Sequence, residues 1–197
     1  MMNSSISLIL LAAGSGKRFK GDKLSFPVNG VPMLQHILQF YSSDSLKNIF
    51  ADKILVTQSS RSTESKYAQE AGFHVIYNDF PEEGISRSIK AGLSVAILNN
   101  PLGFMFSVCD QPYLSEFTVL SLINEFISYP KKIIAPFSER GRGNPVIFPS
   151  SYVSELMSLN GDVGGSKIIN LHLDMLRTIP VSEKELTDID YKPENYR

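Results

Sequence analysis

Short apolar runs alternate with amphipathic segments along this chain. The apolar runs predict buried strands at 6–11, 53–57, 73–77, 103–108 and 133–136, with shorter ones at 145–148 and 178–181. Apolar residues at helical spacing predict helices at 32–41, 61–71, 86–98, 115–126, 152–159 and 165–173. A brief extended segment at 24–28 ends at the turn residues Asn29-Gly30. Strands that alternate with helices are typical of βαβ units, so we expect an α/β fold with a mostly parallel central sheet and helices on both faces.

The length of 197 residues is sufficient for one sizeable core, and no linker or repeat divides the sequence. We therefore expect a single domain over residues 1–197. The formal net charge of −1 gives no global attraction to nucleic acid or to an anionic membrane, so neither is expected as a partner. Cys109 is the only cysteine, which excludes an intrachain disulfide and fits a reducing compartment. No positively charged segment precedes the first apolar run, so we expect a cytoplasmic protein without a signal peptide.

The first predicted strand leads into the most informative stretch of the chain. Small residues follow Leu11, namely Ala12, Ala13, Gly14, Ser15 and Gly16, and the cations Lys17, Arg18, Lys20 and Lys23 come next. Small residues let backbone N–H groups turn toward a bound anion, and cations neutralise its charge. The pattern predicts a phosphate loop at the carboxyl end of a strand, and the alternative is a glycine turn with a solvated basic face. A Walker A loop and a dinucleotide fingerprint are both excluded, the second because Phe19 stands where its last glycine would be.

Asp110 follows the predicted strand at 103–108, which places its carboxylate at the ligand-binding edge of an open α/β sheet. A carboxylate that faces a phosphate loop suits Mg2+, which binds through one or two carboxylates plus substrate phosphates. The alternative is a turn residue ahead of the next helix, with Pro112 as a helix-start residue. We expect its neighbour Cys109 to be a buried packing residue rather than a nucleophile.

A polar cluster surrounds the predicted start of the helix at 86–98. Asn78 ends a strand, and Gly84, Ser86 and Ser88 follow at a helix N-terminus that could bind a base edge or a phosphate. Simple helix capping is the alternative. Serine-hydrolase chemistry has little support, because Ser88 stands where a nucleophile elbow requires glycine. The histidines at 36, 74 and 172 are scattered, so no zinc site is expected.

These motifs together resemble nucleotidyltransferases of the molybdenum cofactor cytidylyltransferase and guanylyltransferase branch. The resemblance rests on L-A-A-G at 11–14 with Arg18 and Lys23, on C-D-Q-P at 109–112, on G-x-G-N-P-V at 141–146, on G-D-x-G at 161–164 and on D-I-D at 188–190. It implies a three-layer Rossmann-like fold, with Arg18, Lys23 and Asp110 as catalytic residues. It also implies a nucleotide site formed by Leu11, Ala12, Ala13, Gly14, Ser15, Gly16, Lys23, Asn78, Gly84, Ser86, Ser88 and Asp110.

The resemblance further implies Mg2+ on Asp110, with a second ligand among Asp162, Asp188 and Asp190. Asp190 is the weaker metal assignment, and Asp162 could instead be a helix N-cap. The reaction implied is transfer of CMP from CTP to molybdopterin cofactor with release of pyrophosphate, and the L-A-A-G form favours CTP over GTP. The alternatives are GTP as donor, another phosphorylated acceptor, or a non-catalytic carrier that delivers finished cofactor to a molybdenum hydroxylase.

Overall fold

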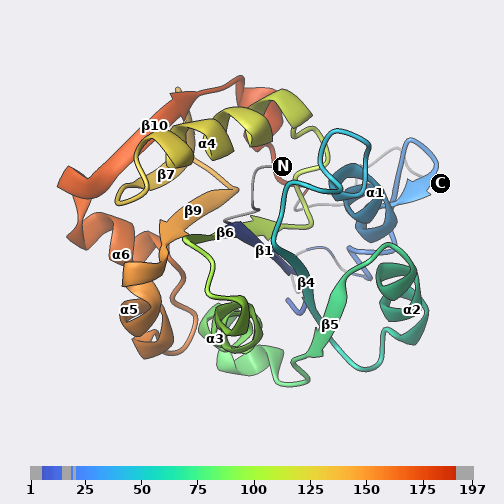
Figure 1. Cartoon of the computed structure of the whole chain (residues 1–197). Coiled ribbons are helices and arrows are strands. Elements are labelled where there is room, and N and C mark those ends of the chain that lie inside the picture. Colours follow the sequence, from blue (N-terminus) through green and yellow to red (C-terminus); the bar gives the residue numbers. More distant parts are fainter. Residues whose placement is uncertain (1–5, 15–18, 20, 190–197) are drawn as a thin grey trace.

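The computed structural model describes residues 6–14, 19 and 21–189, and its centre is one mixed β-sheet (Figure 1). Seven strands follow one another across the sheet in the order β10-β7-β9-β6-β1-β4-β5, and β8 pairs with β7. The bounds of these strands are β1 Ile6–Leu11, β4 Asp52–Thr57, β5 His74–Tyr77, β6 Gly103–Val108, β7 Ile133–Ser138, β8 Gly141–Arg142, β9 Val146–Pro149 and β10 Leu176–Pro180. A separate antiparallel pair is formed by β2 (Pro27–Val28) and β3 (Val31–Pro32).

Most neighbouring strands are parallel, as the alternation of strands and helices predicts. Strand β1 pairs in parallel with β4 and β6, and its last residue, Leu11, lies opposite Val56 on one side and Val108 on the other. The exceptions are β9, which runs antiparallel to both β6 and β7, and the short β8, which runs antiparallel to β7. Only a short loop containing β8 joins β7 to β9, whereas a parallel connection needs a crossover of a dozen residues or more.

Helices cover both faces of the sheet and give three layers (Figure 1). Side chains of α1 (Met33–Tyr41), α2 (Ser62–Glu70) and α4 (Glu116–Ser128) pack in one buried cluster, and those of α3 (Ile85–Ala96), α5 (Val153–Ser158) and α6 (Ser166–Leu171) pack in another. Alternation along β1 links the clusters, because Leu8 and Leu10 join the first and Ile9 joins the second. The sequence therefore predicts the α/β class and the layering correctly.

Local differences from the predicted elements lie at their ends. Short 3-10 helices occur at Pro81–Glu83, Ile97–Asn99, Ser150–Tyr152, Leu173–Met175 and Glu183–Leu186. Of the extended segment at 24–28, only Pro27–Val28 forms a strand. Ser115 caps α4 as predicted, since its Oγ accepts the Thr118 N–H at 3.1 Å. No helix among the described residues has the length and apolar character needed to cross a bilayer.

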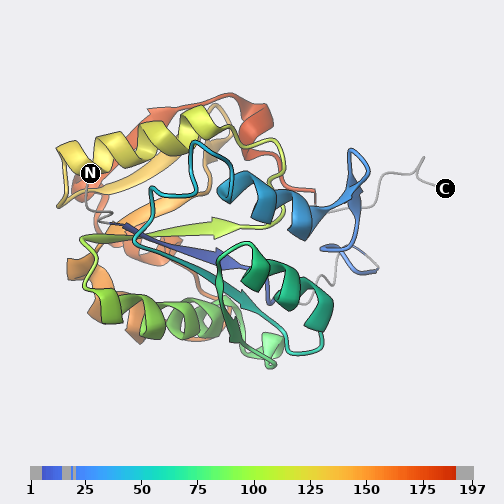
Figure 2. The same ribbon diagram turned by 45° about the vertical axis from the view of Figure 1, so that its right-hand side comes forward.

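The parallel strands bring their carboxyl ends to one edge of the sheet. In Figure 2 the arrowheads of β1, β4 and β6 point the same way, toward the side of the molecule that carries the β2–β3 pair. The segments that follow Leu11, Thr57 and Val108 therefore begin next to one another, although they are far apart in sequence.

Helix α3 lies so close to the sheet that its contact requires a glycine. A Cβ atom on Gly92 would lie 2.5 Å from Cγ2 of Ile9 and 3.0 Å from Cγ2 of Val56. We expect Gly92→Ala to destabilise the fold by about 1–3 kcal/mol through overpacking, despite the better helix propensity of alanine. Denaturant unfolding measures this change, with exposed Ser94→Ala on the same helix as control. A Gly92→Ala variant as stable as wild type would contradict the close packing.

Candidate active site

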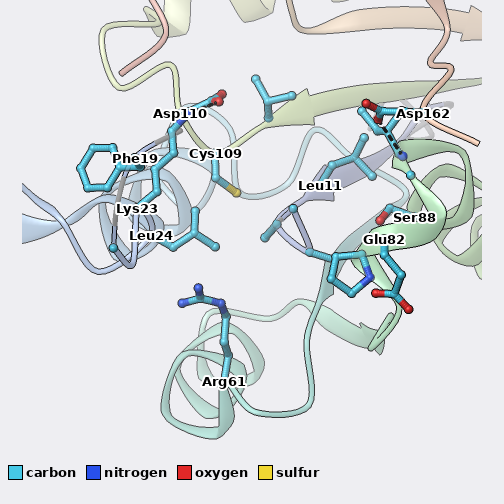
Figure 3. A pocket seen from close by; sticks show the side chains of 18 residues that line it. Leu11, Phe19, Lys23, Leu24, Arg61, Glu82, Ser88, Cys109, Asp110 and Asp162 are labelled. Carbon is cyan, nitrogen blue, oxygen red and sulfur yellow. Dashed lines mark hydrogen bonds and ion pairs between the residues drawn. The ribbon is translucent and has the colours of Figure 1, made fainter. Parts of the chain in front are cut away.

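A cavity of about 600 Å3 opens at the carboxyl edge of the sheet (Figure 3). Its walls come from the end of β1, the loop before β2, the start of α2, the start of α3 and the turn after β6. Eight residues of the predicted nucleotide site line it, namely Leu11, Ala12, Ala13, Gly14, Lys23, Gly84, Ser88 and Asp110. Ser15, Gly16, Arg18 and Asp190 lie outside the described residues.

Lys23 and Asp110 form an ion pair on the cavity wall. Lys23 Nζ lies 2.7 Å from Asp110 Oδ2, and the two side chains are only 13% and 27% exposed. The other carboxylate oxygen of Asp110, Oδ1, is buried and has no hydrogen-bond partner among the described residues. A buried oxygen without a partner is costly, so this atom is suited to bind a cation or to accept a hydrogen bond from a ligand.

The donor set at Asp110 fits Mg2+ better than a metal held wholly by protein. No group of three or more His, Cys, Asp or Glu side chains converges on a metal position within the described part of the chain. Mg2+ commonly binds through one or two carboxylates plus substrate phosphates, and the unpartnered Oδ1 offers one such ligand. The Ile189 N–H donates to the Asp110 carbonyl oxygen at 2.9 Å. The backbone of Ile189, the residue after Asp188, therefore lies beside the turn that carries Asp110.

The sequence analysis missed Arg61, which lies at the start of α2 and lines the cavity. Its guanidinium binds Asp22 in the loop before β2, with Nη1 2.9 Å from Oδ2 and Nη2 2.6 Å from Oδ1. Asp22 also accepts the Ser25 hydroxyl at 2.5 Å and the Leu24 N–H at 3.2 Å. Partial burial opposes ionisation of Asp22, but these hydrogen bonds and the charge of Arg61 lower its pKa to about 2. The bidentate pair therefore fixes the residue directly before Lys23.

Asn78 and Ser86 do not line the cavity, in contrast to Ser88. Asn78 is buried, and its Nδ2 donates to Ser88 Oγ at 2.9 Å while its Oδ1 accepts the Phe80 N–H at 3.2 Å. Ser86 is also buried, and its N–H donates to the Gly161 carbonyl oxygen at 3.3 Å. Asn78 thus orients Ser88, and Ser86 joins α3 to the 161–164 segment.

Asp162 lines the cavity but does not cap the helix that follows it. Gly165 is the N-cap of α6, without a side-chain cap, whereas Asp162 Oδ1 accepts the Ile85 N–H at the start of α3 at 3.4 Å. The two segments touch at Gly84, which has φ of +87° and whose Cβ would lie 2.3 Å from the Gly161 carbonyl carbon. The alternative that Asp162 caps the following helix, α6, is therefore wrong. The loop that contains Asp162 packs against the start of α3 instead.

The charged residues that line the cavity lie in two groups. In Figure 3, Lys23 and Arg61 lie toward one end with Asp110, and Glu82, Ser88 and Asp162 lie toward the other. Cys109 also lines the cavity but is only 2% exposed, and burial raises the pKa of its thiol. The predicted packing role of Cys109 is thus consistent with its burial. Arg61 and Glu82 belong to no motif. The strand order brings Arg61 to the cavity, and Glu82 lies there because it is two residues before Gly84.

A second, smaller cavity of about 140 Å3 adjoins the first and shares Leu11, Ile85 and Val108 with it. Its lining is mostly apolar and includes Asn144 of the G-x-G-N-P-V motif together with Gly164, Gly165 and Ser166. The two glycine-containing motifs therefore meet at this second cavity.

A sheet edge with a small-residue loop, a strand-end carboxylate and a cavity between them defines an α/β protein of the nucleotide-binding type. The chain belongs to the family described as the MobA-like NTP transferase domain, whose model matches residues 8–177.

Two relatives are called "Probable molybdenum cofactor guanylyltransferase". The one from Thermococcus gammatolerans is 26% identical over 140 residues, covering 70% of this chain and 65% of the relative. The one from Natranaerobius thermophilus is 24% identical over 137 residues, covering 68% and 62%. The match thus spans less than two thirds of the length of either relative.

Solved structures share the fold. The crystal structure of Rv0371c from Mycobacterium tuberculosis H37Rv has a TM-score of 0.79 and 21% identity, covering 96% of this chain and 95% of that one. A structure of the same protein in complex with manganese has a TM-score of 0.68 and 21% identity, covering 90% and 89%. The likeness confirms the Rossmann-like nucleotidyltransferase fold that the sequence predicts.

The Asp22–Arg61 pair makes the stability of the protein depend on pH in the acid range. Because the folded pKa of Asp22 is below its unfolded value, its contribution is present above about pH 4 and is lost as pH falls toward 2. We expect Asp22→Asn to cost about 1 kcal/mol at pH 7, a modest value because the pair is partly solvated, and almost nothing at pH 2. Urea unfolding at both pH values measures this, with exposed Asp44→Asn as control. An equal loss at both pH values would contradict the ion-pair origin.

Proposed function

We propose that the protein is a Mg2+-dependent nucleotidyltransferase that transfers CMP from CTP to a phosphate of molybdopterin cofactor. The observation that carries this proposal is the Lys23–Asp110 pair in one cavity, where Asp110 Oδ1 has no hydrogen-bond partner among the residues that the structure describes. Membership of the MobA-like family and the names of the two relatives support the molybdenum cofactor as acceptor.

The positions of the charged side chains in the cavity support one orientation of the nucleotide. The triphosphate would lie at the end with Lys23 and Arg61, where the small residues Ala12, Ala13 and Gly14 leave backbone groups accessible. The nucleoside would lie at the end with Glu82, Ser88 and Asp162, whose oxygens can accept hydrogen bonds from hydroxyl and amino groups. Arg61 would act mainly by holding Asp22, and through it the loop that carries Lys23.

In the proposed reaction, an oxygen of the acceptor phosphate forms a bond to the α-phosphorus of CTP. The bond from that phosphorus to the bridging oxygen breaks, and pyrophosphate leaves with the electron pair. Mg2+, when bound at Asp110, would supply charge neutralisation on the phosphate oxygens. The protein contributes position and electrostatics: Lys23 offsets the charge that develops on the leaving group, and the walls of the cavity orient the reactants.

The second cavity is the candidate acceptor site, because it adjoins the first and is lined by Asn144 of the G-x-G-N-P-V motif and Gly164 of the G-D-x-G motif. Its apolar walls suit a flat heterocycle better than a free sugar phosphate. Another phosphorylated acceptor would need polar partners that this lining offers only at Asn144 and Ser166 among the described residues.

The choice between CTP and GTP has opposing support. The L-A-A-G form at 11–14 favours CTP, whereas the names of both relatives favour GTP. We propose CTP, with GTP as the second candidate. The manganese complex of Rv0371c agrees with a divalent cation in this fold. A non-catalytic carrier that hands cofactor to a molybdenum hydroxylase is less favoured, because it has no need of the Lys23–Asp110 pair.

Pyrophosphate release tests the proposal directly. The purified protein is incubated with Mg2+ and molybdenum cofactor, and CTP, GTP and ATP are supplied in separate reactions. We expect release with CTP, and release with GTP alone would reverse the base assignment but keep the reaction. If nucleotides bind without release, the acceptor is wrong. If none binds, the carrier alternative is favoured.

Substitution of the ion pair separates its two partners. We expect Asp110→Asn and Lys23→Met each to slow transfer by about a hundredfold or more, as for loss of one transition-state donor. Their effects on Mn2+ binding to the free protein should be opposite. Asp110→Asn removes the ligand, whereas Lys23→Met removes an ammonium that competes for the carboxylate.

Isothermal titration with Mn2+ and initial rates measure both effects. Asp52→Asn and Lys53→Met, at the amino end of β4 and therefore at the opposite edge of the sheet, are the matched controls. A near-normal rate in Asp110→Asn would contradict the mechanism.

A further inference from the structure

The segment after β10 contacts three loops near the site, and one of them is the turn that carries Asp110. We call residues 182–189 the strap. It contains the 3-10 helix Glu183–Leu186, and Figure 2 shows it, in red, beside the start of α4. No motif of the resemblance includes its first six residues, and the reaction proposed above assigns it no role.

Glu185 is the main anchor of the strap. Its Oε2 accepts three hydrogen bonds at the N-terminus of α4: from the Ser115 N–H at 3.1 Å, the Ser115 hydroxyl at 2.7 Å and the Thr118 hydroxyl at 2.6 Å. Thr118 is only 2% exposed, and all three bonds are partly buried. Partial burial works against the charge, yet the bonds from Thr118 and Ser115 lower the pKa of Glu185. A carboxylate at a helix N-terminus also interacts favourably with the helix dipole.

Downstream of Glu185 the strap binds the turn that carries Asp110. The Leu186 carbonyl oxygen accepts Nε2 of Gln111 at 3.4 Å, and the Ile189 N–H donates to the Asp110 carbonyl oxygen at 2.9 Å. The Leu186 side chain lies over Gly143, where a Cβ atom would be 2.7 Å from Cδ2 of Leu186. Ile189 then packs against the buried cluster that contains Phe19. The strap thus ties together the C-D-Q-P turn, the G-x-G-N loop and the loop that carries Phe19.

We propose that Glu185 is a positioning residue, which fixes the strap and thereby holds the backbone of the Asp110 turn so that the carboxylate faces Lys23. Glu185 acts through this backbone and lines neither cavity. The inference rests on the proposed function only for its effect on catalysis. The structural part of the inference is that Glu185, about 75 residues downstream, stabilises the Cys109–Pro112 turn. This part can be tested without substrate.

Cys109 supplies a substrate-free readout of the turn. It is the only cysteine of the chain, it is adjacent to Asp110, and it is buried. The rate at which a thiol reagent modifies Cys109 therefore reports how often the turn opens. The matched control is Glu183→Gln, which removes the same charge from the same strap. Glu183 pairs with Arg140 at 2.8 Å, but Arg140 is 77% exposed and surface pairs contribute little.

Glu185→Gln and Glu185→Ala are compared with wild type and Glu183→Gln below the onset of thermal unfolding. We expect Glu185→Ala to speed Cys109 modification about tenfold or more, because three bonds to a charged group are lost, with a smaller increase in Glu185→Gln. We also expect Mn2+ affinity to fall several-fold and kcat to fall about tenfold, while KM for the nucleotide changes less than about twofold, since the phosphate loop is untouched. Glu183→Gln should match wild type throughout.

The outcomes separate this inference from the proposed function. Unchanged Cys109 modification and Mn2+ affinity in both Glu185 variants, or equal changes in Glu183→Gln, would overturn the positioning role. A wild-type protein that releases no pyrophosphate with any nucleotide, but whose Cys109 responds to Glu185→Gln, would overturn the function and keep the role of the strap. If Glu185→Ala does not fold, Glu185→Gln carries the test.

Discussion

The ion pair between Lys23 and Asp110 is the interaction on which the rest of the site depends. It joins residues 87 positions apart, and it exists because β1 and β6 are adjacent and parallel, with Leu11 opposite Val108. The loop after one strand and the turn after the other therefore begin side by side. Two further features act on the position of these partners: the Asp22–Arg61 pair fixes the residue before Lys23, and the strap binds the backbone of Asp110.

Features that are local in sequence could be predicted from it. The alternation of Leu8, Ile9 and Leu10 between two cores follows from the twofold period of a strand, so the three layers can be derived from the pattern alone. The strand ends at Leu11 and Val108 mark where ligand-binding loops begin. The Ser115 cap was also predictable, because capping depends on residues within one turn.

Features that depend on strand order could not be predicted in this way. Arg61 enters the cavity because β4 lies next to β1, and no motif in its own segment indicates this. The sequence allows Asp162 to cap the following helix. Because Gly84 and Gly161 are in close contact, Asp162 instead accepts a hydrogen bond from the N–H of Ile85 at the start of α3. The role of the strap could not be predicted either. In the sequence Glu185 is one of several acidic residues in a polar segment, and only the fold shows that it binds the start of α4.

The two-ended cavity changes where base selectivity should be sought. If the phosphates lie at the Lys23 end, the base lies toward Glu82 and Asp162, at the start of α3 and in the loop after α5. These two segments are joined by the Gly84–Gly161 contact and by the bond from Ser86 to Gly161, so they act as one wall. The side chains of this wall offer hydrogen-bond acceptors to a base. The L-A-A-G form by itself is therefore an incomplete guide to CTP or GTP, because the proposed base-binding wall lies in segments that the motif does not include.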